Sequence, residues 1–367
     1  MNTARAAVLE EVGQPLVLRE FPIPKPQAGE TLVEVIACTL CGSDLHTLHG
    51  KRTVGLPMIL GHEVLGRVAA FGPGDRILDA TGQPLEVGDR VTWSIVASCG
   101  ECFFCRRDLP QKCLHQTKYG HEPVRPGREL TGGLADHCLL VPGTAIFRVP
   151  DELSDAVACP ASCATATIAA ALEAAGPLAG SNVLVLGAGM LGVTAIAWAR
   201  AQGAQNAIAC DVAAQRLALA TRFGATRTCT TTELAAAVAE SAGSHGVDCI
   251  LELTGSPGAF EAALPLARIG GRVILVGSVF PSRPVPLELE HIVRRCLTLQ
   301  GIHNYAPRHL QAALAFLAEN PDIPFASLVA PWQRLGEVNA AALEMPLSPP
   351  AMRIGIRPKE PASNAVP

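Results

Sequence analysis

The chain has 367 residues, of which 49% are hydrophobic and 17% are charged, and its formal net charge is −4. At about 100–200 residues per domain, this length predicts two or three domains with substantial cores, and the apolar fraction excludes a disordered chain. The weakly acidic charge, with Lys and Arg scattered along the chain, is not that of a nucleic-acid-binding protein. We therefore expect a globular protein that binds small molecules.

The cysteine content and the first residues bear on the cellular compartment. Residues 1–12 lack the apolar core of a signal peptide because Arg5, Glu10 and Glu11 interrupt them. Thirteen cysteines cannot all pair, so we expect a reducing, cytoplasmic compartment in which clustered cysteines bind metal or take part in catalysis. Two uncharged stretches, in 156–172 and 183–199, fall short of the roughly 20 residues of a membrane span, and we expect no membrane partner.

The first part of the chain, up to about residue 149, is predicted to be mostly antiparallel β-sheet. Short runs of alternating apolar residues are bounded by Gly and Pro, which is the pattern of half-buried strands. The predicted strands are 32–37, 64–70, 89–93 and 135–141.

Two short motifs in this part suggest a catalytic metal site: Cys41-Gly-Ser-Asp-Leu-His and Gly61-His-Glu. A catalytic zinc needs sulfur or nitrogen ligands and one open position. Cys41 and His62 could supply two ligands and a later cysteine the third, while Asp44 and Glu63 could hold a ligating histidine from behind. A histidine beside a glutamate is also a common surface or core pair, so these motifs alone leave both interpretations open.

Four further cysteines form a cluster with the spacing C-x2-C-x2-C-x7-C. Four thiolates complete a closed tetrahedral zinc site, and such a zinc is structural because no position remains for substrate. An iron–sulfur cluster also uses C-x2-C spacing, although its common patterns differ, and four unrelated buried thiols are the last alternative. The four residues are Cys99, Cys102, Cys105 and Cys113.

From about residue 164 strands alternate with helices, which is typical of a doubly wound parallel sheet. The segment 182–187 is a continuous apolar strand, as expected when both faces of a parallel strand are buried. The alternation ends near residue 301, and the tail could return to pack on the first part. The other predicted strands are 207–211, 247–253 and 272–277, and the predicted helices are 190–202, 213–223 and 257–267.

The first strand and helix of this part are joined by Gly187-Ala-Gly-Met-Leu-Gly, a G-x-G-x-x-G motif in the context that dinucleotide binding requires. Gly187 allows the turn, Gly189 lets a pyrophosphate approach the backbone, and Gly192 lets helix and strand pack closely. Met190 and Leu191 begin the helix whose N-terminus would face the phosphates. The alternative is a glycine-rich packing turn without a ligand.

The next predicted strand ends at Asp211, where a carboxylate can bind the adenosine ribose hydroxyls of a dinucleotide. The negative charge of Asp211 would repel a 2′-phosphate, which favours NAD over NADP. Arg216 follows in the next helix and could lie near the ribose or be a solvated helix residue.

Together, and in this order, these motifs resemble the zinc-containing medium-chain alcohol dehydrogenase family, from Ala6 to about Pro358. The resemblance implies an α/β protein with a GroES-like, mostly antiparallel β catalytic domain, residues 1–163 and 303–367. It also implies a Rossmann domain with a doubly wound parallel sheet that binds NAD, residues 164–302. Members of the family commonly associate through the sheet edge of this second domain, which implies a homodimer or homotetramer.

The resemblance assigns two zinc ions. The cysteine of the C-G-x-D motif and the histidine of the G-H-E motif are ligands of the catalytic zinc, here Cys41 and His62. The third ligand is a cysteine four residues before a threonine at the start of the coenzyme domain. Cys163 with Thr167 matches that pattern, while the nearby Cys159 is the alternative. The structural zinc is assigned to the cysteine cluster.

The resemblance also implies hydride transfer between a small alcohol, or its aldehyde or ketone, and NAD, with zinc as a Lewis acid. Ser43 would pass the alcohol proton through the nicotinamide ribose to His46, although the two could also be a turn hydroxyl and a surface imidazole. Glu63 would tune the zinc from behind. Arg353 resembles a family arginine that contacts the pyrophosphate.

Two segments depart from the family pattern: the loop between Phe71 and Val91 is longer than expected, and segment 117–133 is distinctive. Both resemble a branch associated with phosphonate catabolism. The cations of the second segment could meet an anionic group, although a solvated loop is the commoner case. These cations are Lys118, His121, Arg125 and Arg128.

Two alternative functions remain open on the sequence. A zinc-free quinone or enoyl reductase would share both domains but would need neither the cysteine cluster nor the combination of Cys41, His62 and Cys163. A non-catalytic zinc-binding protein would need no dinucleotide motif, and a nucleic-acid module would carry more positive charge.

Overall fold

The structure, a computed structural model, describes residues 2–339 and 351–358, and the chain divides into two compact units. The first part of the chain passes to the second unit after Cys163 and returns to the first unit at Ala306. The first unit comprises Met1–Cys163, Ala306–Glu319 and Phe325–Pro367, and the second comprises Ala164–Tyr305 and Asn320–Pro324. The return therefore begins three residues after the expected position 303, and residues 320–324 belong to the second unit.

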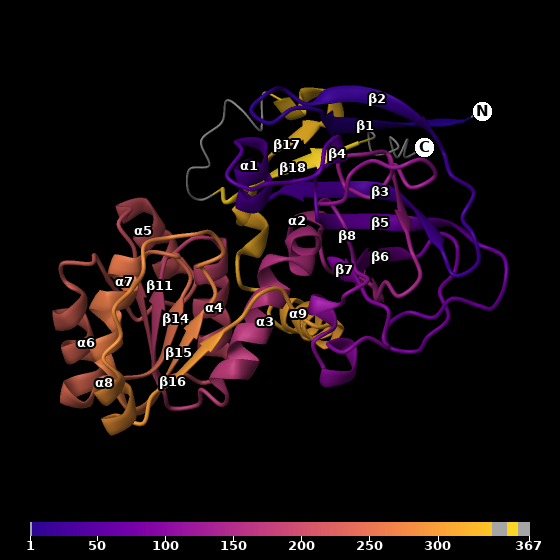
Figure 1. Ribbon diagram of the computed structural model, residues 1–367. Coiled ribbons are helices and arrows are strands. Elements are labelled where there is room, and N and C mark those ends of the chain that lie inside the picture. The colour runs from indigo at the N-terminus through magenta and orange to yellow at the C-terminus, as the bar shows by residue number, and fades with distance from the viewer. Residues whose placement is uncertain (1, 340–350, 359–367) are drawn as a thin grey trace, which may run out of the picture. The chain divides into compact units, whose positions relative to one another are not determined.

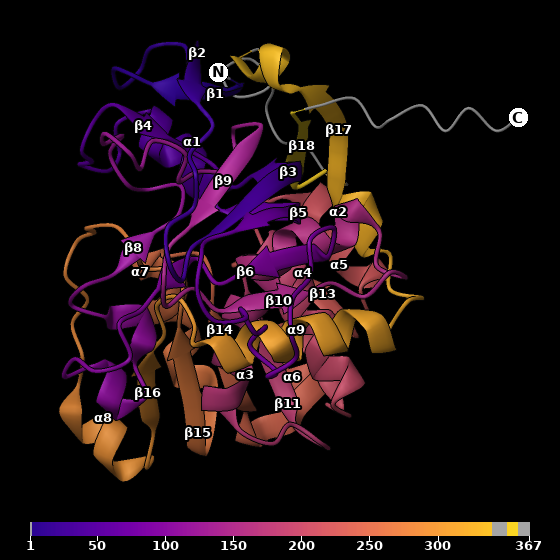
Figure 2. The same ribbon diagram turned by 90° about the vertical axis from the view of Figure 1, so that its right-hand side faces the viewer.

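The first unit is built on a seven-stranded sheet with the strand order β10-β6-β5-β3-β18-β17, in which β9 also pairs with β3. All of these pairs are antiparallel except β17 with β18. Figure 2 shows β3, β5 and β6 side by side. The strands are β3 (Thr31–Leu40), β5 (Glu63–Phe71), β6 (Arg90–Trp93), β9 (His137–Leu140), β10 (Ile146–Arg148), β17 (Val329–Arg334) and β18 (Arg353–Arg357).

Smaller elements complete the first unit (Figure 1). A three-stranded sheet contains β1 (Thr3–Leu9), β2 (Val17–Pro22) and β4 (Met58–Ile59), and a two-stranded ribbon contains β7 (Val96–Ala97) and β8 (Thr117–Lys118). The helices are α1 (Gly42–Leu48), α2 (Asp155–Ala158) and α9 (Pro307–Glu319). Short 3-10 turns span Cys105–Arg107, Pro110–Lys112, Cys159–Ser162, Phe325–Leu328 and Leu335–Glu337.

The core of the first unit follows from the apolar pattern of β3 and β5. Val33, Val35, Val64 and Val68 are each at most 2% exposed and belong to one hydrophobic cluster. Burying each such side chain contributes about 1.5–3 kcal/mol relative to leaving it in water. This burial fixes the strand register, because a slip of one residue would turn the apolar side chains to the other face.

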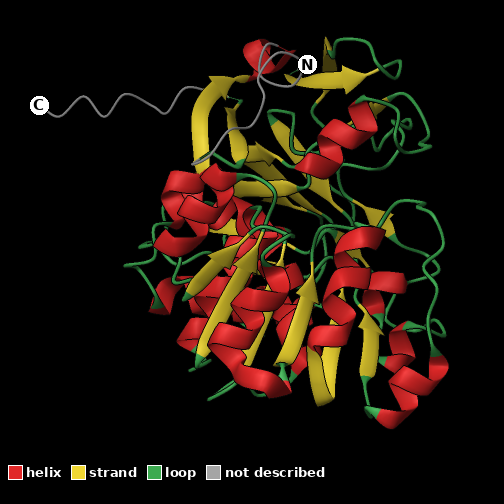
Figure 3. Ribbon diagram, turned by 90° about the vertical axis from the view of Figure 1, so that its left-hand side faces the viewer, coloured by secondary structure: helices red, strands yellow, loops and turns green. Residues whose placement is uncertain are grey.

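The second unit contains a six-stranded parallel sheet with the order β13-β12-β11-β14-β15-β16. Counted from β11, this is the order 3-2-1-4-5-6 of dinucleotide-binding sheets, and Figure 3 shows helices on both faces of the strands. The strands are β11 (Asn182–Leu186), β12 (Asn206–Cys210), β13 (Arg227–Cys229), β14 (Val247–Glu252), β15 (Ala267–Leu275) and β16 (Thr298–Gly301). The helices are α3 (Ala164–Ala175), α4 (Met190–Ala201), α5 (Ala214–Arg222), α6 (Leu234–Ala242), α7 (Pro257–Ala263) and α8 (Leu289–Arg294). The expected α/β class is confirmed.

Several elements of the second unit differ from the sequence-based expectation: α3, α6, α8, β13 and β16 were not predicted, and one predicted helix is shorter in the structure. The predicted helix 257–267 was too long: α7 ends at Ala263, and a 3-10 turn over Leu264–Leu266 leads into β15. Pro265 explains the early end because proline has no backbone N–H to donate within a helix. The Ala-rich helix α6 was not predicted, since its polar and apolar residues show little helical periodicity.

The uncharged stretches of the sequence are interior elements. Residues 183–199 run through β11 and most of α4, and 156–172 run through α2, a 3-10 turn and most of α3. Most residues of α3 and α4 are buried. Among the described residues no single helix is long and apolar enough to cross a membrane. One bent pair of helical segments, Asp155–Ser162 with Ala164–Ala175, has the length and the apolar composition of a membrane span when the two are taken together.

Tyr119 provides a stability test for the first unit. Its side chain is 1% exposed, and its hydroxyl lies 2.6 Å from Thr144 Oγ1 and accepts a hydrogen bond of 2.9 Å from the Val141 amide. Tyr119→Phe leaves a buried amide without this acceptor, so we expect the free energy of unfolding to fall by about 1–3 kcal/mol in urea denaturation. Thr144→Ser keeps the hydroxyl and serves as the control. A loss below about 0.5 kcal/mol for Tyr119→Phe would contradict the assigned hydrogen bonds.

Candidate active site and metal centres

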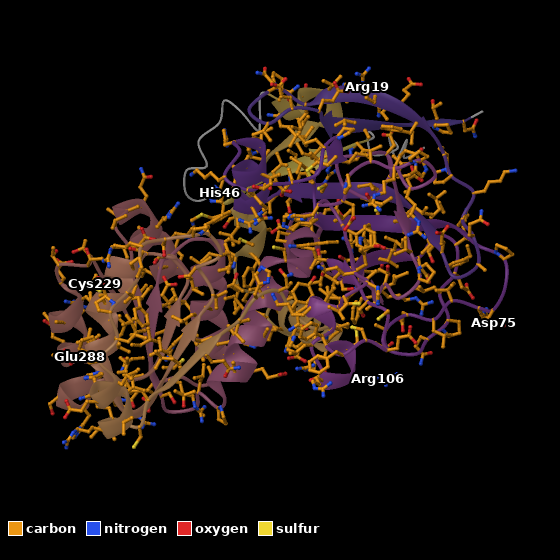
Figure 4. All side chains as sticks on the ribbon, viewed as in Figure 1. Arg19, His46, Asp75, Arg106, Cys229 and Glu288 are labelled. Atoms are coloured by element: carbon orange, nitrogen blue, oxygen red, sulfur yellow. The ribbon has the colours of Figure 1, made fainter. Side chains whose placement is uncertain are left out.

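The candidate active site lies at one end of the main sheet of the first unit. The antiparallel register pairs Thr39 with Glu63, so the segment after β3 lies beside the segment before β5. Cys41 directly follows β3 and caps α1, and His62 directly precedes β5. Figure 4 labels His46, which lies on α1 at the same end of the sheet.

Four side chains converge at this end. Cys41, His62, Glu63 and Cys163 each offer one possible ligand atom, and these atoms lie within 4.8 Å of one another. Cys163 reaches the group from the end of the 3-10 turn that follows α2. Zinc bonds of about 2.0–2.3 Å to nitrogen and sulfur need ligand atoms roughly 3–4 Å apart. The group is therefore compact enough to hold one ion.

Cys159, the alternative third ligand, lies outside this group. It is 0% exposed, and its thiol donates to the carbonyl oxygens of Ala37 and Glu63 at 3.4 and 3.2 Å. Burial raises the pKa of this thiol well above its ordinary value. Cys159 is therefore an inert core thiol, and Cys163 is the cysteine that the structure brings to His62.

His62 is oriented by Asp44. Its Nδ1 lies 3.2 Å from Asp44 Oδ1, and its Nε2 lies 3.3 Å from Ser43 Oγ. Asp44 also accepts hydrogen bonds from the Cys41 and Gly61 amides at 3.0 and 3.2 Å. A carboxylate on one ring nitrogen is how proteins aim the other nitrogen at a metal. Burial opposes protonation of His62, but Asp44 and Cys41 outweigh it and raise its pKa to about 10.

The pKa values of the two thiols of the group, Cys41 and Cys163, are shifted in opposite directions. A hydrogen bond from Cys163 lowers the pKa of Cys41 well below its ordinary value, aided by the charges of Arg353 and His62 and opposed by burial. The same hydrogen bond and burial raise the pKa of Cys163. Thiolates are the metal-binding form of cysteine, so Cys41 is already disposed to ligate.

Glu63 is held by a buried ion pair with Arg353. The guanidinium donates to both carboxylate oxygens at 2.8–3.0 Å, and Thr39 Oγ1 donates to Oε2 at 2.5 Å. The Glu63 and Arg353 side chains are 0% and 6% exposed. Burial and Cys41 raise the pKa of Glu63 although Arg353 lowers it, and Glu63 raises the pKa of Arg353 against burial. With both oxygens engaged by Arg353 and Thr39, Glu63 is the member of the group least free to ligate an ion.

The expectation that Arg353 contacts a pyrophosphate does not fit this geometry. Its Nε and Nη2 are committed to Glu63, and its Nη1 donates to the Met352 carbonyl oxygen at 3.0 Å. A guanidinium that is almost completely buried on a carboxylate is a partner of that carboxylate. The short motif around Arg353 gave no sign of this contact, because Glu63 is far away in the sequence.

Ser43 and His46 share one face of α1, because residues three apart on a helix are neighbours. Ser43 Oγ lies 3.4 Å from Cys41 Sγ as well as 3.3 Å from His62 Nε2. His46 is half-buried, and burial and the charge of Lys51 lower its pKa. Ser43 thus touches two candidate metal ligands, and His46 lies one helical turn further on.

The four cysteines of the cluster come together as a second group that could hold a metal ion. Its sulfur atoms lie within 4.8 Å of one another, with three S–S separations of 3.5, 3.9 and 3.5 Å. A tetrahedral zinc with bonds of about 2.3 Å places sulfurs about 3.8 Å apart. The Leu114 amide, more than any other group, lowers the pKa of Cys102 to about 6. Figure 4 labels Arg106, within the 3-10 turn that carries Cys105.

One neighbour of the first metal group comes from the distinctive segment 117–133. The His121 ring lies 5.1 Å, centroid to centroid, from the His62 ring. The sequence suggested this segment only as a loop of cations and gave no sign that it reaches His62. In contrast, Arg125 and Arg128 are exposed.

The dinucleotide motif of the second unit has the expected local geometry. Gly187 directly follows β11 and has φ of +93°, and Gly189 caps α4. A Cβ on Gly192 would lie 1.9 Å from the Gly187 carbonyl oxygen, so only glycine allows the helix to approach the turn this closely. Met190 and Leu191 form the first turn of α4.

Asp211 directly follows β12 and lies beside this turn. Its carboxylate is 4% exposed and accepts hydrogen bonds from the Ala188 and Ala213 amides at 2.8 and 2.9 Å. Arg216 on α5 is 43% exposed and its Nη1 lies 3.8 Å from Asp211 Oδ2. Thr167 is half-buried on α3 of the same unit.

Comparison with known proteins gives matches over both units. Residues 27–151 match the alcohol dehydrogenase GroES-like domain, and residues 191–319 match the zinc-binding dehydrogenase domain. An alcohol dehydrogenase of Geobacillus stearothermophilus is 34% identical over 321 residues, 86% of this chain and 89% of that protein.

Two solved structures extend the comparison to the whole chain. An alcohol dehydrogenase from Thermotoga maritima superposes with a TM-score of 0.92 at 31% identity and covers 98% of this chain and 100% of its own. A zinc-binding dehydrogenase from Sinorhizobium meliloti, solved with NADP, gives a TM-score of 0.85 at 26% identity over 98% of this chain and 100% of its own.

The ion pair behind the first metal group can be tested by a double-mutant cycle. Arg353→Met leaves a buried carboxylate without its partner, so we expect it to lower the free energy of unfolding by about 3–5 kcal/mol. Adding Glu63→Gln should restore part of that loss, as measured by urea denaturation. The control is Arg308→Met, which breaks an exposed pair with Asp108 (43% and 73% exposed) and should cost less than about 1 kcal/mol. Additive effects at 63 and 353, within about 0.5 kcal/mol, would show that the pair does not couple.

Proposed function

The chain belongs to the zinc-containing medium-chain alcohol dehydrogenase family, and from this premise we propose an NAD-dependent enzyme with two zinc ions per chain. It transfers a hydride between a small alcohol, or the corresponding aldehyde or ketone, and the coenzyme. The observation that carries the proposal is the compact group of Cys41, His62 and Cys163, with a buried carboxylate engaged behind it.

The donor atoms at the first group suit a catalytic zinc. Two sulfurs and the His62 Nε2 are the donors that zinc prefers, and Asp44 fixes the ring. Because Arg353 and Thr39 occupy the oxygens of Glu63, the ion would be held by Cys41, His62 and Cys163, which would leave a position for a substrate oxygen. When bound there, zinc supplies Lewis acidity toward a substrate oxygen.

The second group suits a structural zinc, since four sulfurs leave no open position. The thiolate sulfurs also accept backbone amides, as in the contacts from the Cys99 and His115 amides to Cys113 Sγ, both 3.3 Å. At Cys102, the hydrogen bond from the Leu114 amide lowers the pKa of the thiol to about 6, which favours the thiolate that binds metal.

Ser43 and His46 are proposed to handle the alcohol proton. Ser43 Oγ touches both Cys41 and His62, so its hydroxyl would be close to a substrate oxygen bound at a metal held by these residues. His46, whose pKa is lowered by burial and by the charge of Lys51, is neutral near pH 7 and able to accept a proton.

The proposed coenzyme is NAD rather than NADP. A relative with the same fold was solved with NADP, so the choice depends on residues of this chain. The Asp211 carboxylate, held by two backbone amides beside the glycine turn, would bind ribose hydroxyls and repel a 2′-phosphate. Arg216 neutralises Asp211 only weakly at 3.8 Å and is solvated.

The remaining elements of the proposal are the compartment and the assembly. Six thiols that serve as metal ligands require a reducing compartment, which supports a cytoplasmic location. A homodimer or homotetramer is supported by the edge strand β16 and by exposed apolar side chains near it, among them Leu289 and Val293, 72% and 73% exposed.

The alternative functions receive less support. A zinc-free reductase would not need two groups of soft ligands at metal-binding spacing, and a non-catalytic zinc protein would not need the Gly187 turn with Asp211 beside it. The phosphonate-associated branch is a hypothesis about the substrate.

The catalytic zinc can be tested by exchanging its ligands. We expect Cys41→Ser and Cys163→Ser to lower kcat/KM for alcohols at least about a hundredfold, and to reduce the metal content from two zinc ions per chain to one. Coenzyme affinity should change little, because the dinucleotide motif lies in the second unit. Cys159→Ala is the matched control and should keep both zinc ions. Near-normal turnover in Cys41→Ser would rule out the proposed mechanism.

The coenzyme preference can be tested at Asp211. Removing a carboxylate that opposes a 2′-phosphate should raise the ratio of kcat/KM for NADP to that for NAD about tenfold or more. Asp211→Gly and Asp211→Asn should both shift the ratio, and the second keeps the side-chain volume. Glu240→Gln, an exposed carboxylate of the same unit, controls for general charge effects. An unchanged ratio in both Asp211 variants would contradict the ribose contact.

A further inference from the structure

We propose that the second unit holds a binding site for a tetrahedral oxyanion, phosphate or sulfate, formed by Arg268, Arg272 and Ser181. These residues line a cavity of about 130 Å³ that lies within this unit. The site is separate from the metal groups of the first unit, and it does not depend on the proposed activity.

The cavity lies at the edge of the parallel sheet where the strands begin. It is lined by residues near the start of β14 and β15 and by the segment that leads from the end of α3 to β11. The glycine turn lies at the opposite edge, because it follows the carboxyl end of β11. The five residues of β11 span about 16 Å at about 3.3 Å per residue. The cavity therefore shares no residue with the proposed coenzyme site.

An irregularity in β15 brings the two arginines to the same cavity. In the register of β14 with β15, Asp248 alone lies opposite residues 268–271. Gly270 within this bulge has φ of +73°, a conformation that favours glycine. Bulges redirect side chains and are frequent beside active sites. In a regular strand Arg268 and Arg272 would lie about 13 Å apart, whereas here both line one cavity.

The carboxylate of the cavity is already neutralised. Asp248 Oδ1 accepts a hydrogen bond of 2.6 Å from Arg268 Nε, and Oδ2 accepts one of 2.7 Å from the Asn182 amide. Arg268 Nη1 donates to the Ile269 carbonyl oxygen at 2.6 Å. Arg268 Nη2 has no partner among the residues that the structure describes, so it can donate to a ligand.

Arg272 gives the cavity an excess positive charge. Its Nη1 donates to the Ala175 carbonyl oxygen, which holds the guanidinium at the end of α3. The approach is close, since a Cβ on Gly176 would lie 3.3 Å from Arg272 Cζ. Within the described ranges no carboxylate pairs with Arg272, and its Nε and Nη2 have no hydrogen-bond partner. The guanidinium is thus fixed in position with donors and a charge that the protein does not use.

The third donor and the size of the cavity define the ligand. The Ser181 hydroxyl makes no hydrogen bond to any described residue. One water needs about 10–15 Å³ of cavity, and sites for drug-sized ligands have about 300–1,000 Å³, so the observed volume suits a small ion. Guanidinium groups bind oxyanions through charge-assisted hydrogen bonds. A tetrahedral oxyanion has enough oxygens for three separate donor groups, whereas a carboxylate has two.

The test is a calorimetric titration of the zinc-loaded enzyme with phosphate and with sulfate. The protein is saturated with NAD so that neither anion can occupy the glycine turn, and chloride keeps the ionic strength constant. We expect one saturable site per chain for at least one of the two anions. Arg272→Met should weaken binding about tenfold or more, because it removes a charge-assisted hydrogen bond, and Arg272→Lys should retain part of the affinity.

Two further variants complete the test. Ser181→Ala should weaken binding about threefold or more, and it leaves the Arg272 contact with α3 in place should Arg272→Met fail to fold. The matched control is Arg227→Met, which removes an exposed arginine of the same unit that pairs with Glu240. It should bind the anion as the wild type does. Because an anion that binds only the folded protein stabilises it, the anion should also raise the Tm of the wild type more than that of Ser181→Ala.

The outcomes decide the site without reference to catalysis. Absence of a saturable site for either anion would overturn the inference. Equal affinity in wild type, Arg272→Met and Ser181→Ala would also overturn it, because the anion would then bind elsewhere, for example at a metal. Acetate that binds as tightly as phosphate or sulfate would overturn the assignment to a tetrahedral oxyanion.

Discussion

The structure depends on the antiparallel register of β3 with β5 and β18. That register is set by apolar side chains that must face the core, among them Val33 and Val64. As a consequence Cys41, His62 and Arg353, which lie far apart in the sequence, meet at one end of one sheet. The burial of apolar side chains thus sets the strand register, and the register brings the reactive side chains of the first unit together. A slip of one residue in either strand pair would separate the ligands from the carboxylate behind them.

What the sequence predicted well is local. The cysteine cluster and the glycine turn each lie within one short segment, and their local geometry is set by spacing and by the flanking strand and helix. The alternation of strands and helices likewise sufficed for the α/β class. The third ligand was left open between Cys159 and Cys163, four residues apart, because only the path of the 3-10 turn decides which thiol faces His62.

What the sequence could not predict depends on contacts between distant segments. Arg353 was assigned to a pyrophosphate because its motif is short, whereas its environment is set by Glu63 and by burial. His121 was seen only as one cation of a loop, since its distance from His62 depends on the close approach of Gly120 to Gly61. In both cases the contact that decides the environment of the residue is made by a segment far away in the sequence, and sequence patterns do not show which distant segments meet. In the protein interior the dielectric constant is low, and electrostatic interactions such as the Arg353–Glu63 ion pair are therefore stronger than in water.

The position of β18 in the sheet has a consequence for biosynthesis. This strand supplies Arg353 and pairs with β3, yet the ribosome makes it after every strand of the second unit. The nascent chain can therefore complete the parallel sheet of the second unit while the main sheet of the first unit still lacks its last-made strands. Until β18 emerges, Glu63 lacks the Arg353 counter-ion, so the buried ion pair beside Cys41 and His62 is completed only at the end of synthesis.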